Sequence, residues 1–183
     1  MIFGRIAPAF VASLALLTLS YSPAGAVWFA DQQSGCKAYF PYAAKADETG
    51  RWNGACRNGL AQGHGAFEVL AGGRPDFMLA GDWRGGKLNG HGVYTQWNIF
   101  EKNDPFETRF EGAYRDSARN GHGVETWADG GRFEGEFADG DANGHGVLMS
   151  ADGTRHEGIW KGGCLRDGDR WLTIGVPEVM CGD

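Results

Sequence analysis

Large hydrophobic side chains recur in this chain on either side of an isolated glycine, two residues before it and two residues after it. In the segment Phe110-Glu111-Gly112-Ala113-Tyr114, the two aromatic residues and the glycine share one face of an extended strand, because side chains in a strand alternate between its faces. The glycine leaves a gap on that face. The pattern therefore predicts strands in which an aromatic side chain lies over bare glycine backbone.

Turn signals follow each of these strands. Pairs of the type that two-residue hairpin turns favour stand four and five residues after the glycine, and most of them contain the glycine that positive φ requires. The pairs are Asn58-Gly59, Gly85-Gly86, Asp116-Ser117, Asp139-Gly140 and Gly162-Gly163. A Gly-His-Gly sequence then opens a second strand at Gly63, Gly90, Gly121 and Gly144. Each unit is thus predicted to be a β-hairpin.

The units repeat along the chain. Their anchor glycines are spaced by 27, 31, 23 and 23 residues, which indicates a basic unit of 23 residues, and they are Gly54, Gly81, Gly112, Gly135 and Gly158. Five hairpins side by side predict an all-β fold, a single-layer, elongated, twisted antiparallel sheet of about ten strands. In such arrays function usually lies in an extended surface.

Two of the units show the repeat most clearly. The segments Arg109-Phe110-Glu111-Gly112-Ala113-Tyr114 and Arg132-Phe133-Glu134-Gly135-Glu136-Phe137, each followed by a Gly-His-Gly strand, closely resemble the MORN repeat. The resemblance extends over residues 51–168. The opening unit, with Cys56 in the repeat and Cys36 upstream, is similar to that of exported bacterial MORN proteins with cysteine-bearing ends. The resemblance implies scaffolding, protein interaction, self-association or lipid contact, and no shared enzymatic activity.

The ends of the chain lie outside the repeats. Arg5, a mostly apolar run from Ile6 to Leu19 and the small residues Ala24-Gly25-Ala26 predict a signal peptide over residues 1–26, cleaved after Ala26. An uncleaved anchor is the alternative, but the apolar run is shorter than the roughly 20 residues that span a bilayer. The remaining predicted parts are an N-terminal cap (27–50), five repeats (51–168) with an insertion at 98–107, and a tail (169–183) that covers the last sheet edge. The protein is expected to be periplasmic or secreted.

Charge narrows the possible partners. Without the signal peptide the chain has 16 basic and 23 acidic side chains, a net charge of −7. An acidic chain argues against nucleic acid and weakly against anionic membrane surfaces, because both attract basic faces.

Four cysteines in an exported chain suggest two disulfides. Consecutive hairpins lie about 10 Å apart, whereas the Cα atoms of a disulfide lie within about 7 Å. If the array is extended, pairing between its ends is excluded, which leaves Cys36–Cys56 and Cys164–Cys181. Zinc is the less favoured alternative, since no Cys-x-x-Cys spacing occurs.

Aromatic residues are the candidate binding residues. Two interpretations stay open for them: packing between hairpins, or a groove that binds an extended peptide, a glycan or an acyl chain. Four of them stand two residues after an anchor glycine and form a stripe: Trp83, Tyr114, Phe137 and Trp160. Two more, Trp97 and Trp127, lie on second strands. The last two, Phe100 and Phe106, lie in the insertion.

The charged and histidine residues of the repeats give no strong catalytic signal. The Gly-His-Gly histidines occupy equivalent positions about 10 Å apart, too far to share one zinc ion, so no metal or cofactor is expected. Three glutamates precede anchor glycines (Glu111, Glu134 and Glu157), and pairing with Arg109, Arg132 and Arg155 is the expected role. The sequence predicts an exported, non-enzymatic scaffold or protein-interaction module with an unidentified protein partner. Lipid or membrane-surface binding, cell-wall glycan binding or hydrolysis, and self-association are the alternatives.

Overall fold

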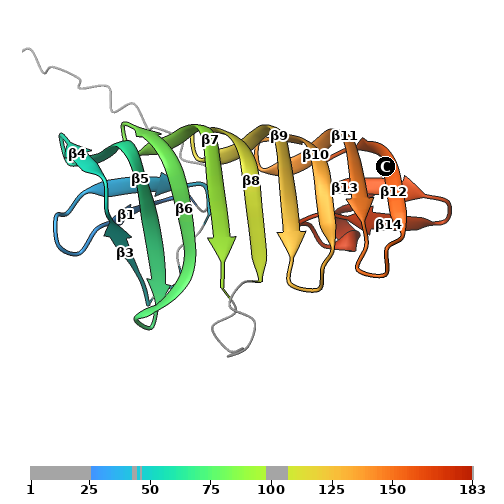
Figure 1. The fold of residues 1–183 in the computed structure, drawn as a ribbon, viewed down its shortest axis with the longest axis horizontal. Helices are drawn as coiled ribbons and strands as arrows, with labels where there is room; N and C mark the ends of the chain where they lie inside the picture. Colours follow the sequence, from blue (N-terminus) through green and yellow to red (C-terminus); the bar gives the residue numbers. More distant parts are fainter. Residues whose placement is uncertain (1–25, 43–44, 46, 98–106, 183) are drawn as a thin grey trace, which may run out of the picture.

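The computed structural model describes residues 26–42, 45, 47–97 and 107–182. These residues form one long sheet of 12 strands, in the order β1-β2-β5-β6-β7-β8-β9-β10-β11-β12, with β3 and β4 both paired to β5 (Figure 1). A separate two-stranded sheet contains β13 and β14. Consecutive strands from β5 to β12 pair antiparallel, so the prediction of an elongated all-β array of hairpins is confirmed.

The strands are β1 (Val27–Ala30), β2 (Lys37–Phe40), β3 (Glu48–Trp52), β4 (Ala55–Arg57), β5 (Leu60–Ala71), β6 (Arg74–Arg84), β7 (Lys87–Gln96), β8 (Thr108–Arg115), β9 (Ala118–Trp127), β10 (Arg132–Ala138), β11 (Asp141–Met149), β12 (Arg155–Trp160), β13 (Cys164–Asp167) and β14 (Arg170–Thr173). A short 3-10 helix, η1 (Glu178–Met180), follows.

The predicted turns have the backbone conformation that their sequences indicate. Asp116 and Ser117 have φ values of 51° and 68°, so this turn takes up positive φ at both residues even without a glycine. The Ser117 amide also donates to the carbonyl oxygen of Leu88 at 2.9 Å, and the Leu88 amide donates to the Ser117 hydroxyl at 3.0 Å. Equivalent turn amides of Gly86, Gly140 and Gly163 bond the carbonyls of Ala61, Arg119 and Ala142, so each turn is tied to the preceding hairpin.

Glycines form a continuous row across the sheet from β5 to β12. Gly81, Gly112 and Gly135 each pair with the second glycine of a Gly-His-Gly on both sides, and Gly158 pairs with Gly146 on one side. A Cβ at Gly135 would lie 2.7 Å from both the Gly146 Cα and the Phe133 Cζ. The Phe133 ring meets Phe137 and Trp160 edge-on, with centroids 5.5 and 5.0 Å away. The predicted packing of aromatic rings over glycine backbone is thus confirmed.

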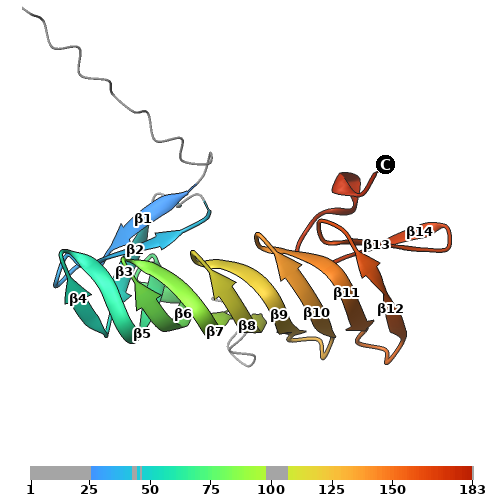
Figure 2. The ribbon, with the colours of Figure 1, turned by 90° about the horizontal axis from the view of Figure 1, so that it is seen from above.

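Both ends of the chain fold over this aromatic face, which we call the capped face (Figure 2). At the N-terminal end the Phe40 ring of β2 lies 5.5 Å from Phe67, 5.7 Å from Phe77 and 6.0 Å from Trp83. At the C-terminal end Ile174 is buried, and its amide bonds the Gly163 carbonyl at 2.8 Å. The β1–β2 and β13–β14 hairpins cover the two ends of the face and leave its middle strands uncovered.

The tail does not close the last sheet edge. Strand β12 pairs only with β11 among the described residues, and β13 and β14 pair with each other. The tail instead packs on the capped face, because its buried Ile174 belongs to the hydrophobic core and Leu172 packs against that core. The expectation that the tail covers the edge was therefore wrong.

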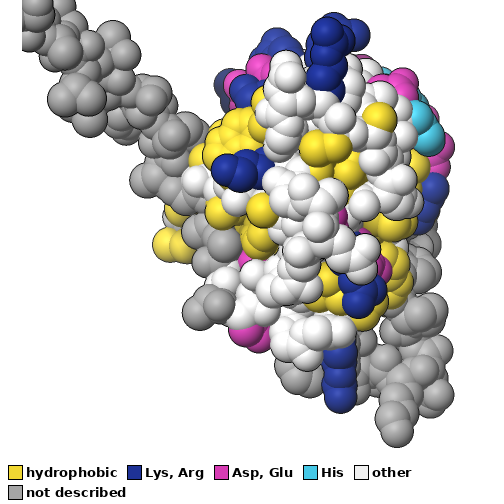
Figure 3. Space-filling model, turned by 90° about the vertical axis from the view of Figure 1, so that its left-hand side faces the viewer, with side chains coloured by type: hydrophobic (Ala, Val, Ile, Leu, Met, Phe, Trp, Pro, Cys, Tyr) yellow, Lys and Arg dark blue, Asp and Glu magenta, His cyan; other side chains and the backbone are white. Residues whose placement is uncertain are grey.

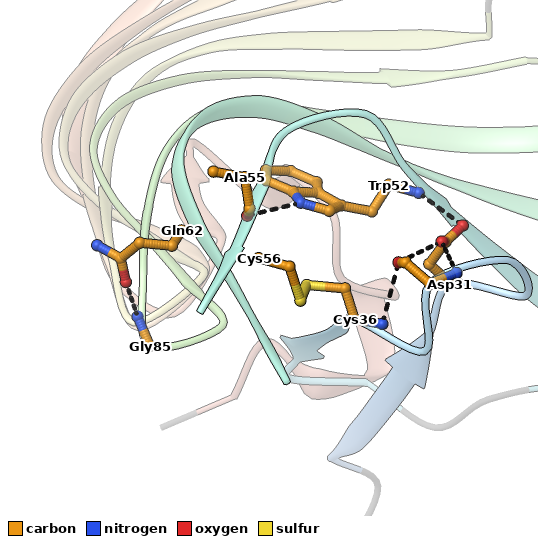
Figure 4. The surroundings of a disulfide bond; sticks show 8 residues. Asp31, Cys36, Trp52, Ala55, Cys56, Gln62 and Gly85 are labelled. Carbon is orange, nitrogen blue, oxygen red and sulfur yellow. Dashed lines mark hydrogen bonds between the residues drawn. A yellow bond between two sulfur atoms is a disulfide. The ribbon is translucent and has the colours of Figure 1, made fainter. Parts of the chain in front are cut away.

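Two disulfides fix the ends of the array, with Cα–Cα distances of 5.9 Å for Cys36–Cys56 and 5.8 Å for Cys164–Cys181. Both predicted pairings are confirmed. Beside the first disulfide the Asp31 carboxylate accepts from the Trp52 amide at 3.2 Å, and the Trp52 indole donates to a backbone carbonyl (Figure 4). These bonds hold the cap against β3, the first strand at that end.

The N-terminal end of the sheet is only partly polar. Hydrophobic side chains form separate patches there, between lysine and arginine side chains (Figure 3). Trp28 of β1 is 45% exposed. The predicted signal peptide, apart from Ala26, and the insertion at 98–107, apart from Glu107, lie outside the described residues.

Candidate functional site

A groove of about 510 Å³ runs along the capped face between the two end segments. Strands β6, β7, β8 and β9 supply its floor. One wall comes from the residues around Tyr42 and Lys45 that follow β2, and the other includes Gly175 after β14. A volume of several hundred Å³ is typical of sites for small molecules or short peptide segments.

Aromatic side chains line much of this groove. Phe77, Tyr94, Tyr114 and Trp127 come from the floor strands, and Tyr42 comes from the wall. The Tyr42 ring lies 5.3 Å from Phe77, and the Phe77 ring lies 5.6 Å from Tyr94. The rings of Tyr42, Phe77 and Tyr94 thus form one aromatic surface on the side of the groove nearer the N-terminal end.

An ion pair interrupts that surface at the centre of the sheet. Arg119 Nη1 donates to Glu125 Oε2 at 2.8 Å, and only 23% and 7% of the two side chains is exposed. In the other repeats the positions equivalent to these two hold apolar residues. The equivalents of Arg119 are Ala61, Leu88 and Ala142, and those of Glu125 are Phe67, Tyr94 and Leu148.

The surroundings of this pair explain its geometry. Arg119 Nε donates to the Gly140 carbonyl at 2.8 Å, and the guanidinium lies 5.0 Å from the Phe137 ring centroid. Burial raises the pKa of Glu125 above its ordinary value, and Arg119 acts in the opposite direction. The arginine is thus held by a carbonyl and a ring while it neutralises a buried carboxylate.

A second charged cluster lies at the wall. Lys45 Nζ lies 3.1 Å from Asp76 Oδ2 and 3.6 Å from Glu48 Oε1, and the Asp76 and Glu48 side chains are 9% and 1% exposed. The hydrogen bond to Asp76 raises the pKa of Lys45. The Tyr42 hydroxyl is buried without a hydrogen-bond partner among the described residues. Burial, and next the charge of Glu48, raise the Tyr42 pKa, so the phenol stays protonated.

The repeats on which the groove is built match a known family. Residues 80–96, 110–132 and 133–155 match the MORN repeat. Three segments of the chain are thus similar to the MORN repeat. The second matched segment includes all of β9, the strand that carries Arg119 and Glu125. A search of curated proteins finds no match to the chain.

The aromatic residues of the stripe after the anchor glycines mostly pack inside the fold and offer little contact surface. Trp83, Tyr114, Phe137 and Trp160 are all 6% exposed or less, because their rings fill the space over the glycine row and pack against one another. Of the two interpretations left open for these residues, their burial favours packing between hairpins, and of the four Tyr114 borders the groove.

The other candidate residues have different outcomes. Trp127 is half-buried at the groove, whereas Trp97 is half-buried outside it. Phe100 and Phe106 lie outside the described residues.

Sequence reasoning missed the polar groups of the groove. Comparison of the repeats column by column could have found Arg119 and Glu125, since both replace apolar residues. Lys45 and Asp76 lie outside the aligned columns, and only the folding of the N-terminal cap over β6 brings them together.

The opposite face of the sheet carries the predicted glutamate–arginine pairs. Glu111, Glu134 and Glu157 bond Arg109, Arg132 and Arg155 at 2.7, 2.6 and 2.5 Å. These arginines lower the pKa of each glutamate. A Gly-His-Gly histidine lies 3.0–3.6 Å from each glutamate as well. This face is a regular, solvent-exposed ionic ladder, and across the described residues no three histidine, cysteine or acidic side chains gather into a metal-binding group. Likewise, no helix within the described ranges is long and apolar enough to cross a membrane.

Proposed function

We propose that this protein is an exported, non-enzymatic MORN-repeat module that binds a partner protein in the groove between its two end segments. One observation carries the proposal: the Arg119–Glu125 pair replaces apolar residues where the groove crosses the sheet. A buried ion pair is a weak source of stability compared with apolar packing. Polar groups that converge in an aromatic groove are the usual arrangement of a binding site.

The two disulfides support an oxidising compartment, because such bonds are rare in the cytosol. A periplasmic or secreted location after cleavage at Ala26 is part of the proposal. N-terminal sequencing of the protein from an envelope or culture fraction tests it. A mature chain that begins near Val27 is the expected result, and an intact Met1 would contradict export by cleavage.

Site-specific crosslinking tests the groove. A photoreactive amino acid would replace Trp127 in one variant and Ile159 in another, because Ile159 is 61% exposed on the opposite face of β12. We expect a discrete protein adduct in the native envelope from position 127 and none from position 159. The adduct must also form with the purified partner and disappear when unlabelled protein is added in excess.

Other outcomes would replace the proposal. Flotation with anionic vesicles in the absence of a protein adduct would favour membrane-surface binding. Protection of the groove by cell-wall fragments would favour a glycan ligand. Adducts made only of this chain, with light scattering that shows a dimer, would favour self-association.

A further inference from the structure

The groove has more negative than positive charge. Three carboxylates border it, on Glu48, Asp76 and Glu125, and two cations border it, on Lys45 and Arg119. The carboxylate side chains are at least nine-tenths buried. Because aromatic side chains line much of the groove and the whole chain has a net charge of −6, the field of the protein attracts cations to this groove.

The hydrogen-bonding capacity of the groove has the same bias. Both cations are already used, since Lys45 contacts Asp76 and Glu48, and Arg119 bonds Glu125 and the Gly140 carbonyl. By contrast, Asp76 Oδ1 and Glu125 Oε1 accept no hydrogen bond from the residues that the structure describes. A carboxylate oxygen only accepts hydrogen bonds, so a ligand has to supply donors.

The aromatic surface also suits a cation. Tyr94 lies between the two charged clusters, because its strand β7 stands between β6, which carries Asp76, and β9, which carries Glu125. Faces of tyrosine and tryptophan rings attract ammonium and guanidinium groups. The molecule contains internal examples, since the Lys87 ammonium lies 5.0 Å from the Tyr39 ring centroid and the Arg166 guanidinium lies 5.3 Å from the Trp171 ring centroid.

We infer that the groove recognises a lysine or arginine side chain, presented by an extended segment of the partner protein. The basic group lies between Asp76 and Glu125 against the rings of Tyr94 and Trp127, and it competes with Lys45 for Asp76. The inference rests on the proposed function, since it names the chemistry of the partner that the groove binds.

Two peptides that differ only in charge test this inference. The probes are acetyl-Leu-Arg-Leu-amide and the same peptide with citrulline, which keeps the shape of arginine and removes its charge. We expect calorimetry to give a dissociation constant about 10- to 100-fold lower for the arginine peptide, from one charge-assisted hydrogen bond and one cation–π contact. Amide NMR shifts should centre on Tyr94 and Trp127. Higher salt should reduce the difference.

Two protein variants locate the effect. Asp76→Asn should remove most of the preference for arginine. Asp82→Asn removes an equal charge from an exposed side chain that bonds His64 on the opposite face, and it should leave binding unchanged. Lys45→Met should tighten binding of the arginine peptide severalfold, because the competing ammonium is gone. A purely structural role for Lys45 predicts no such gain.

The outcomes separate this inference from the proposed function. Equal affinity for both peptides, with shifts in the groove, would overturn the charge preference and leave the groove as a binding site. No shift in the groove with either peptide would overturn the inference, and the crosslinking experiment at Trp127 would then decide the proposed function independently. The citrulline comparison needs no mutation, so it holds even if a variant fails to fold.

Discussion

Removal of Arg119 is the sharpest test of how the groove is built. In the variant Arg119→Leu, the leucine reproduces the equivalent residue of the preceding repeat, Leu88, which is fully buried. The substitution leaves the Glu125 carboxylate, with 7% of its side chain exposed, without its counter-charge. Breaking a buried ion pair by loss of one partner costs about 3–5 kcal/mol of unfolding free energy.

The double variant Arg119→Leu/Glu125→Leu gives the contrasting result. It places apolar residues at both positions, as Ala142 and Leu148 do at the equivalent positions of the fourth repeat. Replacement of a buried ion pair by apolar residues of similar volume is often neutral or stabilising. We therefore expect the double variant to unfold within about 1 kcal/mol of the parent, or above it. Urea denaturation with intact disulfides measures the unfolding free energy of all three proteins. In thermal denaturation the melting temperature of the single variant should lie about 6–20 °C below that of the parent.

The pH dependence has a definite sign. Burial raises the pKa of folded Glu125, so its contribution to stability is fully present below the ordinary glutamate pKa and falls as pH rises toward the folded value. Loss of Arg119 removes the lowering influence and raises that pKa further. The deficit of Arg119→Leu should therefore be largest at neutral pH and shrink toward about pH 4. A single variant as stable as the double variant at neutral pH would refute this account of the buried charge.

Three further predictions concern the array. Gly135→Ala should lower the unfolding free energy by about 2–3 kcal/mol, because the added Cβ meets the Gly146 Cα at 2.7 Å. The control Gly182→Ala should be neutral, because a Cβ there meets nothing within 4 Å. Equal urea midpoints for the two variants would contradict the close packing at Gly135. Joint replacement of Cys36 and Cys56 by serine should cost about 3 kcal/mol in the same assay, and an unchanged midpoint would show that the bond constrains little. Arg132→Gln should lower the unfolding free energy by less than about 1 kcal/mol at pH 7, because the pair with Glu134 is exposed. Arg132 lowers the pKa of Glu134, so this small effect is lost as pH falls through that pKa. A large effect in high salt would contradict this prediction.

The repeats could be predicted from the sequence because their signals are local. Gly112 and its neighbours fix the strand faces, and the pair Asp116-Ser117 fixes a turn by residues that tolerate positive φ. The disulfide pairing followed from distance alone, since an extended array separates Cys56 from Cys164. None of these inferences needed knowledge of contacts between distant segments.

The groove could not be predicted in the same way. It depends on the fold of the N-terminal residues around Lys45 over Asp76 of β6, a contact between segments 31 residues apart that no repeat pattern encodes. The aromatic stripe illustrates a second limit. Periodicity placed Trp83 and Trp160 on one face but could not say what covers that face, and the rings turn out to be buried.

The double variant also separates stability from recognition. If the Arg119–Glu125 pair serves only the fold, its replacement by two leucines changes nothing that a partner can detect. If the pair serves the groove, the same protein keeps its melting temperature but loses the Glu125 Oε1 acceptor, so its preference for arginine over citrulline should fall as it does in Asp76→Asn. If the double variant still prefers arginine, the ion pair serves the fold alone. If a fully stable double variant loses that preference, the ion pair serves binding, because an apolar pair would stabilise the array equally well.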